Sequence, residues 1–146
     1  CYDFLEEAKA FFGADKIAVA HHMDDQAESI LLHLVRGSGL RGLCGMAPRR
    51  GDIIRPLLCL SKAEIESYLT NENLPYCTDA TNFIAEGTRN KLRLETIPYL
   101  KREFNPRLVE SLCAMGEMLS EDEGYLCQIA ERELKAARWI RQGGAE

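Results

Sequence analysis

The sequence lacks several features that mark specialised classes of protein. It has no apolar run of the ~18 residues that a transmembrane helix needs, so we predict no membrane partner. It lacks the Cys-x-x-Cys and His-x-x-x-His spacings of common zinc sites, so we predict no bound metal. It also lacks an initiator methionine and a basic-then-apolar leader, and we expect a piece excised from a longer cytoplasmic protein.

The composition is that of an ordinary globular domain. The 146 residues are 46% hydrophobic and 28% charged, which is enough to bury a core without cross-links. The six cysteines are therefore expected to be reduced thiols in a cytoplasmic compartment. A net charge of −5 argues against a protein that coats nucleic acid over its whole surface, but it is compatible with local basic patches.

The first half of the chain has the pattern of an α/β fold. Apolar residues from Phe4 to Phe12 recur at helical spacing, and the apolar run 17–20 indicates a buried strand. A polar junction separates that strand from a second helix, which ends near Gly37. Such sheets normally have about four to six strands, and only one strong strand is visible. We therefore predict the C-terminal half of a doubly wound, Rossmann-like parallel sheet.

Two weaker elements follow the second helix. The segment 53–58 is apolar but is interrupted by Arg55 and Pro56, which favours a short strand or a strand at the sheet edge. Ser61 together with Glu64 forms a capping box, which predicts the start of a further helix.

The second half of the chain is helical in pattern. Asn105-Pro106 predicts the start of one helix, and Ser120 with Glu123 predicts the start of another. We accordingly divide the chain into residues 1–87, the second half of an α/β catalytic domain, and residues 88–146, an all-helical linker.

The polar junction after the first strand holds the densest group of titratable side chains, namely His21, His22, Asp24, Asp25 and Glu28. Open α/β sheets bind ligands where a strand ends and a helix begins. A helix N-cap at Asp24 or Asp25, with Glu28 as its capping-box partner, would account for only part of the group. Asp25 and Glu28 share a helix face, which suits an ammonium group better than a metal alone. We favour a ligand site over a simple cap.

The segment 37–42 matches the pattern G-x-G-x-x-G. A dinucleotide site requires that pattern to follow a strand and open a helix, whereas here it closes a helix, so we reject that assignment. We interpret the glycines as a turn that carries a basic patch able to meet phosphates, with a merely solvated loop as the alternative. The arginines of this patch are Arg36, Arg41, Arg49, Arg50 and Arg55.

A second basic stretch begins at Arg89 and continues with Lys91 and Arg93. The two basic stretches flank a long segment without periodicity, and long ordered loops tend to be functional. This arrangement fits a polyanionic partner, although a solvated helix face is the alternative.

Several blocks of the sequence, in order, closely resemble the bacterial tRNA(Ile)-lysidine synthetases, which are PP-loop ATP pyrophosphatases. The blocks are A-H-H-M-D-D-Q-A-E-S (20–29), L-V-R-G-S-G-L-R-G-L (34–43), I-R-P-L-L (54–58), D-A-T-N (79–82), T-R-N-K-L-R (88–93) and F-N-P-R (104–107). The resemblance covers about residues 17 to 119. The S-G-G-x-D-S phosphate loop of that family is missing, so we expect this piece alone to be inactive.

The resemblance implies an ATP-dependent ligase that forms a C–N bond. Such an enzyme uses ATP, accompanied by Mg²⁺, to adenylate the wobble cytidine of an isoleucine tRNA, and free L-lysine then displaces AMP to form lysidine. The implied partners are ATP, lysine and the anticodon region of that tRNA, and a homodimer is compatible with the sequence.

The resemblance also implies roles for individual residues. Asp25 and Glu28 would bind the ammonium groups of lysine, His21 and His22 would border the nucleotide, and Arg89 with Asp25 would act at the reacting site. Contacts with phosphate or tRNA are expected from Arg36, Arg41, Arg55, Lys91 and Arg93.

Two alternatives stay open. Another PP-loop tRNA-modifying enzyme, such as a thiolase, would share the fold, although the sequence has no Cys-x-x-Cys pair. A catalytically empty tRNA-binding or dimerisation module would use the same elements without the chemistry. An S-G-G-x-D-S motif upstream would favour the enzyme.

Overall fold

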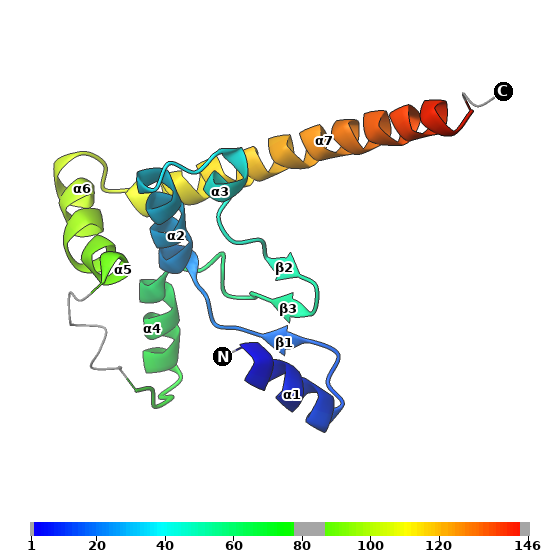
Figure 1. Ribbon diagram of the computed structural model, residues 1–146. Helices are drawn as coiled ribbons and strands as arrows, with labels where there is room; N and C mark the ends of the chain where they lie inside the picture. Colours follow the sequence, from blue (N-terminus) through cyan, green and yellow to red (C-terminus); the bar gives the residue numbers. More distant parts are fainter. Residues whose placement is uncertain (1, 78–86, 144–146) are drawn as a thin grey trace.

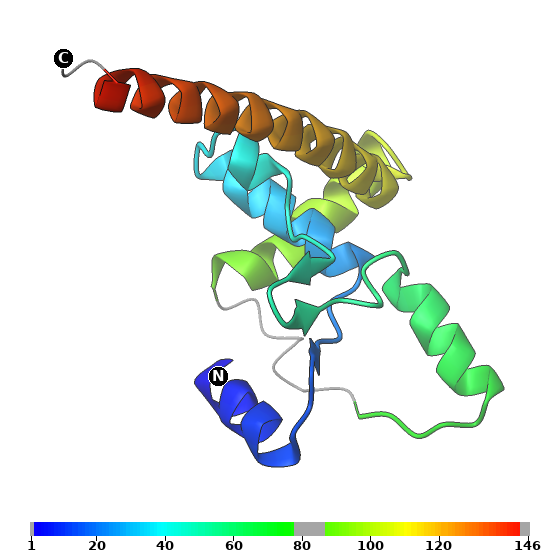
Figure 2. The ribbon, with the colours of Figure 1, turned by 90° about the vertical axis from the view of Figure 1, so that its right-hand side faces the viewer.

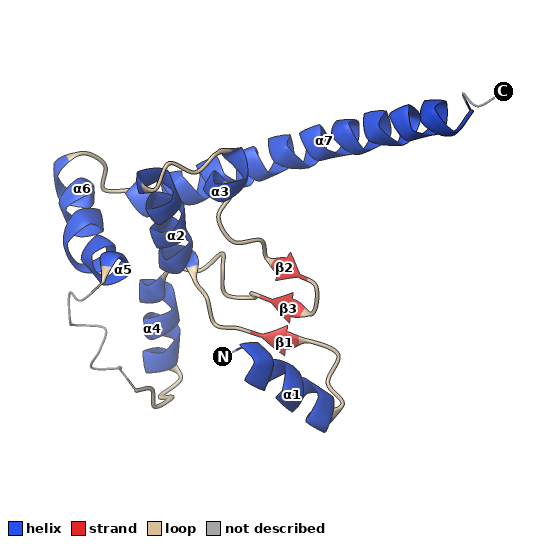
Figure 3. Cartoon of the chain, viewed as in Figure 1, coloured by secondary structure: helices blue, strands red, loops and turns tan. Residues whose placement is uncertain are grey.

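The computed structural model describes residues 2–77 and 87–143, and the side chains of residues 3–77 and 87–137. Helices lie above, below and to one side of a small sheet in the view of Figures 1 and 3. In chain order the elements are α1 (Tyr2–Phe12), β1 (Ile17–Ala18), α2 (Met23–Val35), α3 (Leu40–Leu43), β2 (Arg49–Arg50), β3 (Ile53–Ile54), α4 (Lys62–Asn71), α5 (Thr88–Lys91), the π-helical turn η2 (Leu92–Thr96), α6 (Ile97–Glu103) and α7 (Leu108–Gly143). The predicted motif block 79–82 lies outside the described residues.

The three strands form a mixed sheet in the order β1-β3-β2. Strand β1 pairs in parallel with β3, with Ile17 opposite Ile53, as an α/β fold requires. Strand β2 pairs with β3 in antiparallel orientation. The sheet is therefore not wholly parallel, and β3 is its central strand and not an edge. A tight turn through Gly51, whose φ is +60°, brings the exposed strand β2 alongside β3 as the edge.

Helix α2 supplies the centre of the hydrophobic core. It buries one apolar face against η2, α6 and α7, and the buried cluster consists of Ala27, Ile30, Leu31, Leu92, Ile97, Val109 and Leu112. Helix α7 approaches α2 closely because Gly116 has no side chain: a Cβ atom there would lie 2.9 Å from Cδ1 of Ile30. The core thus unites elements from both sides of the predicted boundary at residue 87.

Where a helix end depends on neighbouring residues, it lies where the sequence predicts it. Helix α1 ends at Phe12 and is followed by Gly13, whose φ of +61° suits glycine just after a helix C-terminus. Helix α4 begins with the predicted capping box. The Ser61 hydroxyl accepts a hydrogen bond from the amide of Glu64, and the Glu64 carboxylate accepts one from the amide of Ser61.

Two predicted helix starts were wrong. The N-cap of α2 is His22 and not Asp24 or Asp25, and its amide donates to the Asp25 carboxylate at 3.1 Å. No helix begins at Ser120, because α7 runs unbroken from Leu108 to Gly143. Inside a continuous helix the amides near Ser120 are already bonded to the preceding turn, so a Ser-x-x-Glu pattern has no free amides to cap.

The remaining helices lie around this core. Helices α1 and α4 lie at the periphery, and the C-terminal part of α7 projects beyond the other elements (Figures 1 and 2). Across residues 2–77 and 87–143, no helix is both long and apolar enough to cross a lipid bilayer.

Replacing Ile30 by Ala is expected to lower the free energy of unfolding by about 2–5 kcal/mol, because the side chain is fully buried and its removal leaves a cavity against α7. Val35→Ala is the matched control on the same helix. Val35 is 70% exposed, so its removal should change stability by less than about 0.5 kcal/mol. Urea denaturation measures both, and equal effects of the two changes would contradict the packing described here.

Candidate functional site

An ionic cluster joins the beginning of α2 to α5 and η2. It consists of Asp25 and Glu28 from α2, Arg89 from α5 and Arg93 from η2. Its hydrogen-bonded partners lie 61 to 68 residues apart in the sequence. The sequence analysis named all four residues but did not predict that they pair with one another.

Glu28 is the buried centre of the ionic cluster, with a side chain that is 2% exposed. Its Oε2 accepts hydrogen bonds from Nε of Arg89 and from Nη2 of Arg93, both at 3.0 Å. Its Oε1 accepts a bond from Nε of Arg93. A buried carboxylate requires such partners, and hydrogen bonding to Glu28 in turn raises the pKa of Arg93. Both oxygens of Glu28 are therefore committed to holding arginines.

Asp25 lies at the less enclosed side of the same cluster, where its side chain is 13% exposed. Its Oδ1 is 2.9 Å from Nη2 of Arg93 and 3.8 Å from Nη2 of Arg89. Its Oδ2 accepts the amide hydrogen of His22. The two carboxylates predicted to bind lysine are thus brought together, but each already has guanidinium partners.

Among the described residues, Arg89 has hydrogen-bond partners along only one edge of its guanidinium group, the edge formed by Nε and Nη2. Its Nε is fixed by Glu28, and its Nη2 lies 3.5 Å from the hydroxyl of Ser29. No residue in the described parts of the chain bonds its Nη1, and the side chain is 46% exposed. The guanidinium is oriented by the cluster while its outer edge stays accessible to an anion.

His22 and Asp24 attach helix α4 to the start of α2. Asp24 Oδ2 accepts the amide hydrogen of Lys62, the first residue of α4, at 2.8 Å. It also lies 3.6 Å from Nδ1 of His22. The interaction with His22 lowers the pKa of Asp24 to about 2 and raises the pKa of His22. Asp24 therefore acts between two helices, at a place where the sequence suggested a cap for α2.

His21 contacts Arg55, the one arginine of the predicted basic patch that is buried. Arg55 Nε donates to Nδ1 of His21 at 3.4 Å, and its Nη1 donates to the carbonyl of Ala47 at 2.7 Å. Burial lowers the pKa of His21, which favours the neutral ring that Nδ1 needs to accept a hydrogen bond. Arg55 is thus buried, with its guanidinium bonded to the loop 44–48, whereas its predicted contact with phosphate or tRNA stays a prediction.

The other basic residues named from the sequence are exposed: Arg36, Arg41, Arg49, Arg50 and Lys91. In the described parts of the chain, none of them forms an ion pair with the ionic cluster. Their predicted contact with phosphate or tRNA stays a prediction.

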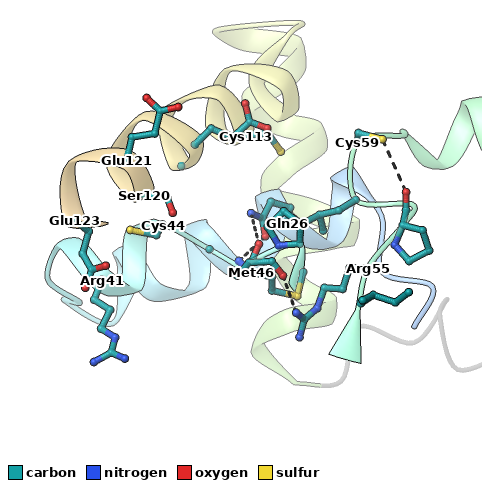
Figure 4. Close-up of a pocket in the computed structure, with 18 residues that line it drawn as sticks. Gln26, Arg41, Cys44, Met46, Arg55, Cys59, Cys113, Ser120, Glu121 and Glu123 are labelled. Carbon is teal, nitrogen blue, oxygen red and sulfur yellow. Dashed lines mark hydrogen bonds between the residues drawn. The ribbon is translucent and has the colours of Figure 1, made fainter. Parts of the chain in front are cut away.

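A cavity of about 830 Å³ lies between α7, the loop 44–48 and the end of β3 (Figure 4). Gln26, which the sequence analysis missed, fixes one wall. Its side-chain amide donates to the carbonyl of Met46 and accepts the amide hydrogen of Met46, at 3.1 and 2.7 Å. The only signal in the sequence for this role of Gln26 was a polar residue between apolar positions of α2, in a chain that also has a glycine-rich loop. Arg55 lines the same cavity.

The resemblance implies Mg²⁺ beside ATP, and the described residues do not fit a metal cage. Among residues 3–77 and 87–137, no three His, Cys, Asp or Glu side chains are grouped to hold a metal ion. The two carboxylates of the ionic cluster are already paired with arginines. We therefore derive no chemical step through a protein-bound metal.

Asp24→Ala is expected to destabilise the protein by about 1 kcal/mol near neutral pH, because it removes the acceptor for the first amide of α4. The pKa of Asp24 is about 2 in the folded state, below its ordinary value of 3.8. The contribution is therefore present above about pH 4 and is lost as the pH falls toward about 2. Urea denaturation across this range measures the difference, and Asp24→Asn, which keeps the acceptor oxygen, is the control. A difference from wild type that persists unchanged at about pH 2 would contradict this assignment.

Comparison with known proteins shows which proteins the chain is similar to in sequence. The chain is 43% identical, over 145 residues and 92% of its length, to the tRNA(Ile)-lysidine synthase of Caldanaerobacter subterraneus subsp. tengcongensis, of which it covers 31%. It is 45% identical over 120 residues to the protein of that name from Bacteroides thetaiotaomicron, with 82% of this chain and 28% of the relative covered. For the protein of that name from Geobacter sulfurreducens, the identity is 41% over 147 residues, with 99% and 31% covered.

The chain spans less than a third of the length of these curated relatives. The sequence profile of the PP-loop domain matches residues 1–100, which include β1, α2 and all four residues of the ionic cluster. Because this match covers more than half of the chain, the chain belongs to the PP-loop domain family.

Proposed function

We propose that this chain is the substrate-binding part of a tRNA(Ile)-lysidine synthase. Such an enzyme transfers AMP from ATP to the wobble cytidine of an isoleucine tRNA and then replaces AMP by free lysine. The observation that carries the proposal is the ionic cluster, in which two carboxylates and two guanidiniums meet just beyond the end of β1. Ligands of open α/β sheets bind at such a strand end. The names of the relatives support the assignment.

The position of β1 supports a larger sheet in the whole enzyme. Strand β1 is the edge of the described sheet, and its only described partner is β3. Parallel sheets are normally buried and contain more strands, so further parallel strands would pair with the free edge of β1. We therefore propose a doubly wound sheet of which this chain supplies one half. Because its substrates are ATP, tRNA and free lysine, we propose a cytoplasmic enzyme; a homodimer and Mg²⁺ bound with ATP stay predictions.

In the adenylation step we assign the transition-state contact to Arg89. The cytidine oxygen attacks the α-phosphorus and pyrophosphate leaves, so negative charge builds up on the phosphate oxygens. Glu28 holds Nε of Arg89 and so orients the accessible edge of its guanidinium. A preoriented cation of this kind stabilises the transition state without reorganising.

In the second step we assign the lysine contact to Asp25 and Glu28. An ammonium group binds a carboxylate by the same charge-assisted hydrogen bonds as a guanidinium, so lysine would exchange with an arginine of the cluster. Asp25 is the less buried carboxylate and would receive the ammonium first. It would also accept the proton that the ammonium loses before the neutral amine attacks carbon 2 of the cytidine and AMP leaves.

Removing the guanidinium of Arg89 tests the first assignment. In the whole enzyme, Arg89→Ala should lower the single-turnover rate of tRNA adenylation by about 10²–10³-fold, the usual effect of losing one transition-state charge partner, with little change in tRNA affinity. Arg102→Ala is the matched control, because Arg102 is exposed and pairs with its neighbour Glu103. An adenylation rate equal to that of the control would refute the role of Arg89.

Incorporation of radiolabelled lysine into isoleucine tRNA tests the second assignment. Asp25→Asn should raise the KM for lysine at least ~30-fold, with adenylation in the absence of lysine largely kept. Glu28→Gln should raise the same KM and also slow adenylation, because Glu28 holds Arg89. Asp52→Asn, on a surface turn beside Lys16, is the control.

Melting curves for each variant separate a loss of lysine binding from a loss of folding. A normal lysine KM in both Asp25→Asn and Glu28→Gln would mean that these carboxylates only hold the arginines and do not bind lysine. Wild-type enzyme that incorporates no lysine into the tRNA would overturn the proposed function itself.

A further inference from the structure

The imidazole of His22 lies between the two aspartates at the start of α2. Its Nε2 is 3.4 Å from Oδ2 of Asp25, and its Nδ1 is 3.6 Å from Oδ2 of Asp24. Both distances are longer than an ordinary hydrogen bond, and Nδ1 is buried with no hydrogen-bond partner in the described parts of the chain. The ring therefore has a carboxylate near each nitrogen and a strong bond to neither.

The charges around His22 favour a proton on this ring. The titratable and charged groups near it are Asp24, Asp25 and Glu28 of α2, Arg93 of η2, Lys62 of α4 and the neighbouring His21. The interaction with Asp24 contributes most to raising the pKa of His22. Asp25 adds to the rise, whereas partial burial and the charge of Arg93 oppose it. An imidazole ordinarily titrates near pH 6.5, so the neutral and protonated forms of His22 are both populated near neutral pH.

The lysine step of the proposed function needs a proton acceptor of this kind, so the inference rests on that function. An amine attacks only after its ammonium form, with an ordinary pKa of about 10.4, has lost a proton. Carboxylates are weak bases, with ordinary pKa values of about 4, so a carboxylate that takes this proton must hand it on at neutral pH. An imidazole, with an ordinary pKa of about 6.5, is the stronger base.

We infer that His22 is a positioning residue for the lysine step, which orients Asp25 and takes from it the proton that the lysine ammonium gives up. The backbone amide of His22 holds Oδ2 of Asp25 at 3.1 Å, and Nε2 lies 3.4 Å from the same oxygen. Asp24, on the other side of the ring, favours the neutral form with its hydrogen on Nδ1, which leaves the lone pair of Nε2 toward Asp25.

The transfer balances without a further reactant. The ammonium replaces an arginine at Asp25, and one of its N–H bonds breaks as the carboxylate takes the proton. Rotation about the Cβ–Cγ bond interchanges the two carboxylate oxygens, so the proton can pass from Asp25 to Nε2 of His22. The carboxylate is regenerated, and the electron pair left on the amine attacks carbon 2 of the cytidine as AMP leaves.

A small cavity gives the proton a route to solvent. It has a volume of about 170 Å³, and its lining includes His22, Asp24 and Lys62 together with Glu28 and Arg93 of the ionic cluster. A space of that size holds several water molecules, each of which occupies about 30 Å³ in the liquid. The side chain of Lys62 is 55% exposed, so a proton released from the imidazole reaches solvent beside α4.

The pH dependence of the lysine step tests the inference in the whole enzyme. Isoleucine tRNA is first adenylated with ATP in the absence of lysine, and release of AMP after addition of saturating lysine then reports the second step alone. In wild type this rate should rise about tenfold per pH unit below the pKa of His22 and stay level above it, because only the neutral imidazole accepts a proton. His22→Gln keeps a polar nitrogen near Asp25 but accepts no proton. It should slow the step by about 10²-fold and abolish the bend at that pKa.

His33→Asn is the matched control. Nδ1 of His33 bonds to the carbonyl of Gly42 at 2.7 Å, and asparagine keeps a donor for it. This variant should keep the wild-type profile. A wild-type rate and bend in His22→Gln would overturn the inference, and so would an equal slowing at every pH with the bend kept, which is the result of a merely structural role. Slowed adenylation with an unchanged lysine step would also overturn it and would assign His22 to the nucleotide.

A second measurement applies if His22→Gln does not fold. In wild-type enzyme with lysine bound, NMR titration gives the pKa of the His22 imidazole, which should coincide with the bend in the rate profile. A bend at a different pH would overturn the inference. Wild-type enzyme that transfers no lysine would instead overturn the proposed function, whereas failure of this inference leaves wild-type transfer intact.

Discussion

The carboxylate of Glu28 is the constraint on which the arrangement of the site depends. Hydrophobic burial brings α2, η2 and α7 together, but burial of apolar area is not directional and does not by itself fix how the helices are oriented. A buried carboxylate tolerates only arrangements that supply cations with good geometry. The bonds from Arg89 and Arg93 therefore fix how α5 and η2 lie against α2, and they orient Arg89 beyond the end of β1. The same side chain therefore fixes both the packing of these elements and the orientation of Arg89.

The sequence predicted those features that a few neighbouring residues determine. The end of α1 at Gly13 and the capping box at Ser61 need only local hydrogen bonds, and both were confirmed. The order of the strands was not predicted, because the hairpin that places β2 outside β3 depends on a sheet pairing that periodicity does not reveal. The unbroken course of α7 through Ser120 likewise depends on the helix that precedes it, since a capping pattern is effective only where amides are free.

In the candidate site too, the sequence identified residues but not the contacts between them. Counting charged residues in a short window identified Asp25 and Glu28, and the family resemblance identified Arg89. The pairing of Arg89 with Glu28 joins positions more than 60 residues apart and follows from the tertiary fold. The burial of Arg55 was not predicted, because the sequence does not distinguish it from the exposed arginines of the same patch. Its burial depends on the loop 44–48, which Gln26 fixes by two hydrogen bonds to Met46. Residue types were thus readable from the sequence, whereas exposure and partnership were not.

The ionic cluster and Arg55 differ in how their charges are balanced. The ionic cluster has two carboxylates and two guanidiniums, so a new charged group can enter only by exchange with one that is already there. Arg55 has no carboxylate partner among the described side chains and donates instead to His21 and to the carbonyl of Ala47. A charged ligand at the ionic cluster would therefore compete with a protein side chain, whereas Arg55 has no such competitor among the described side chains.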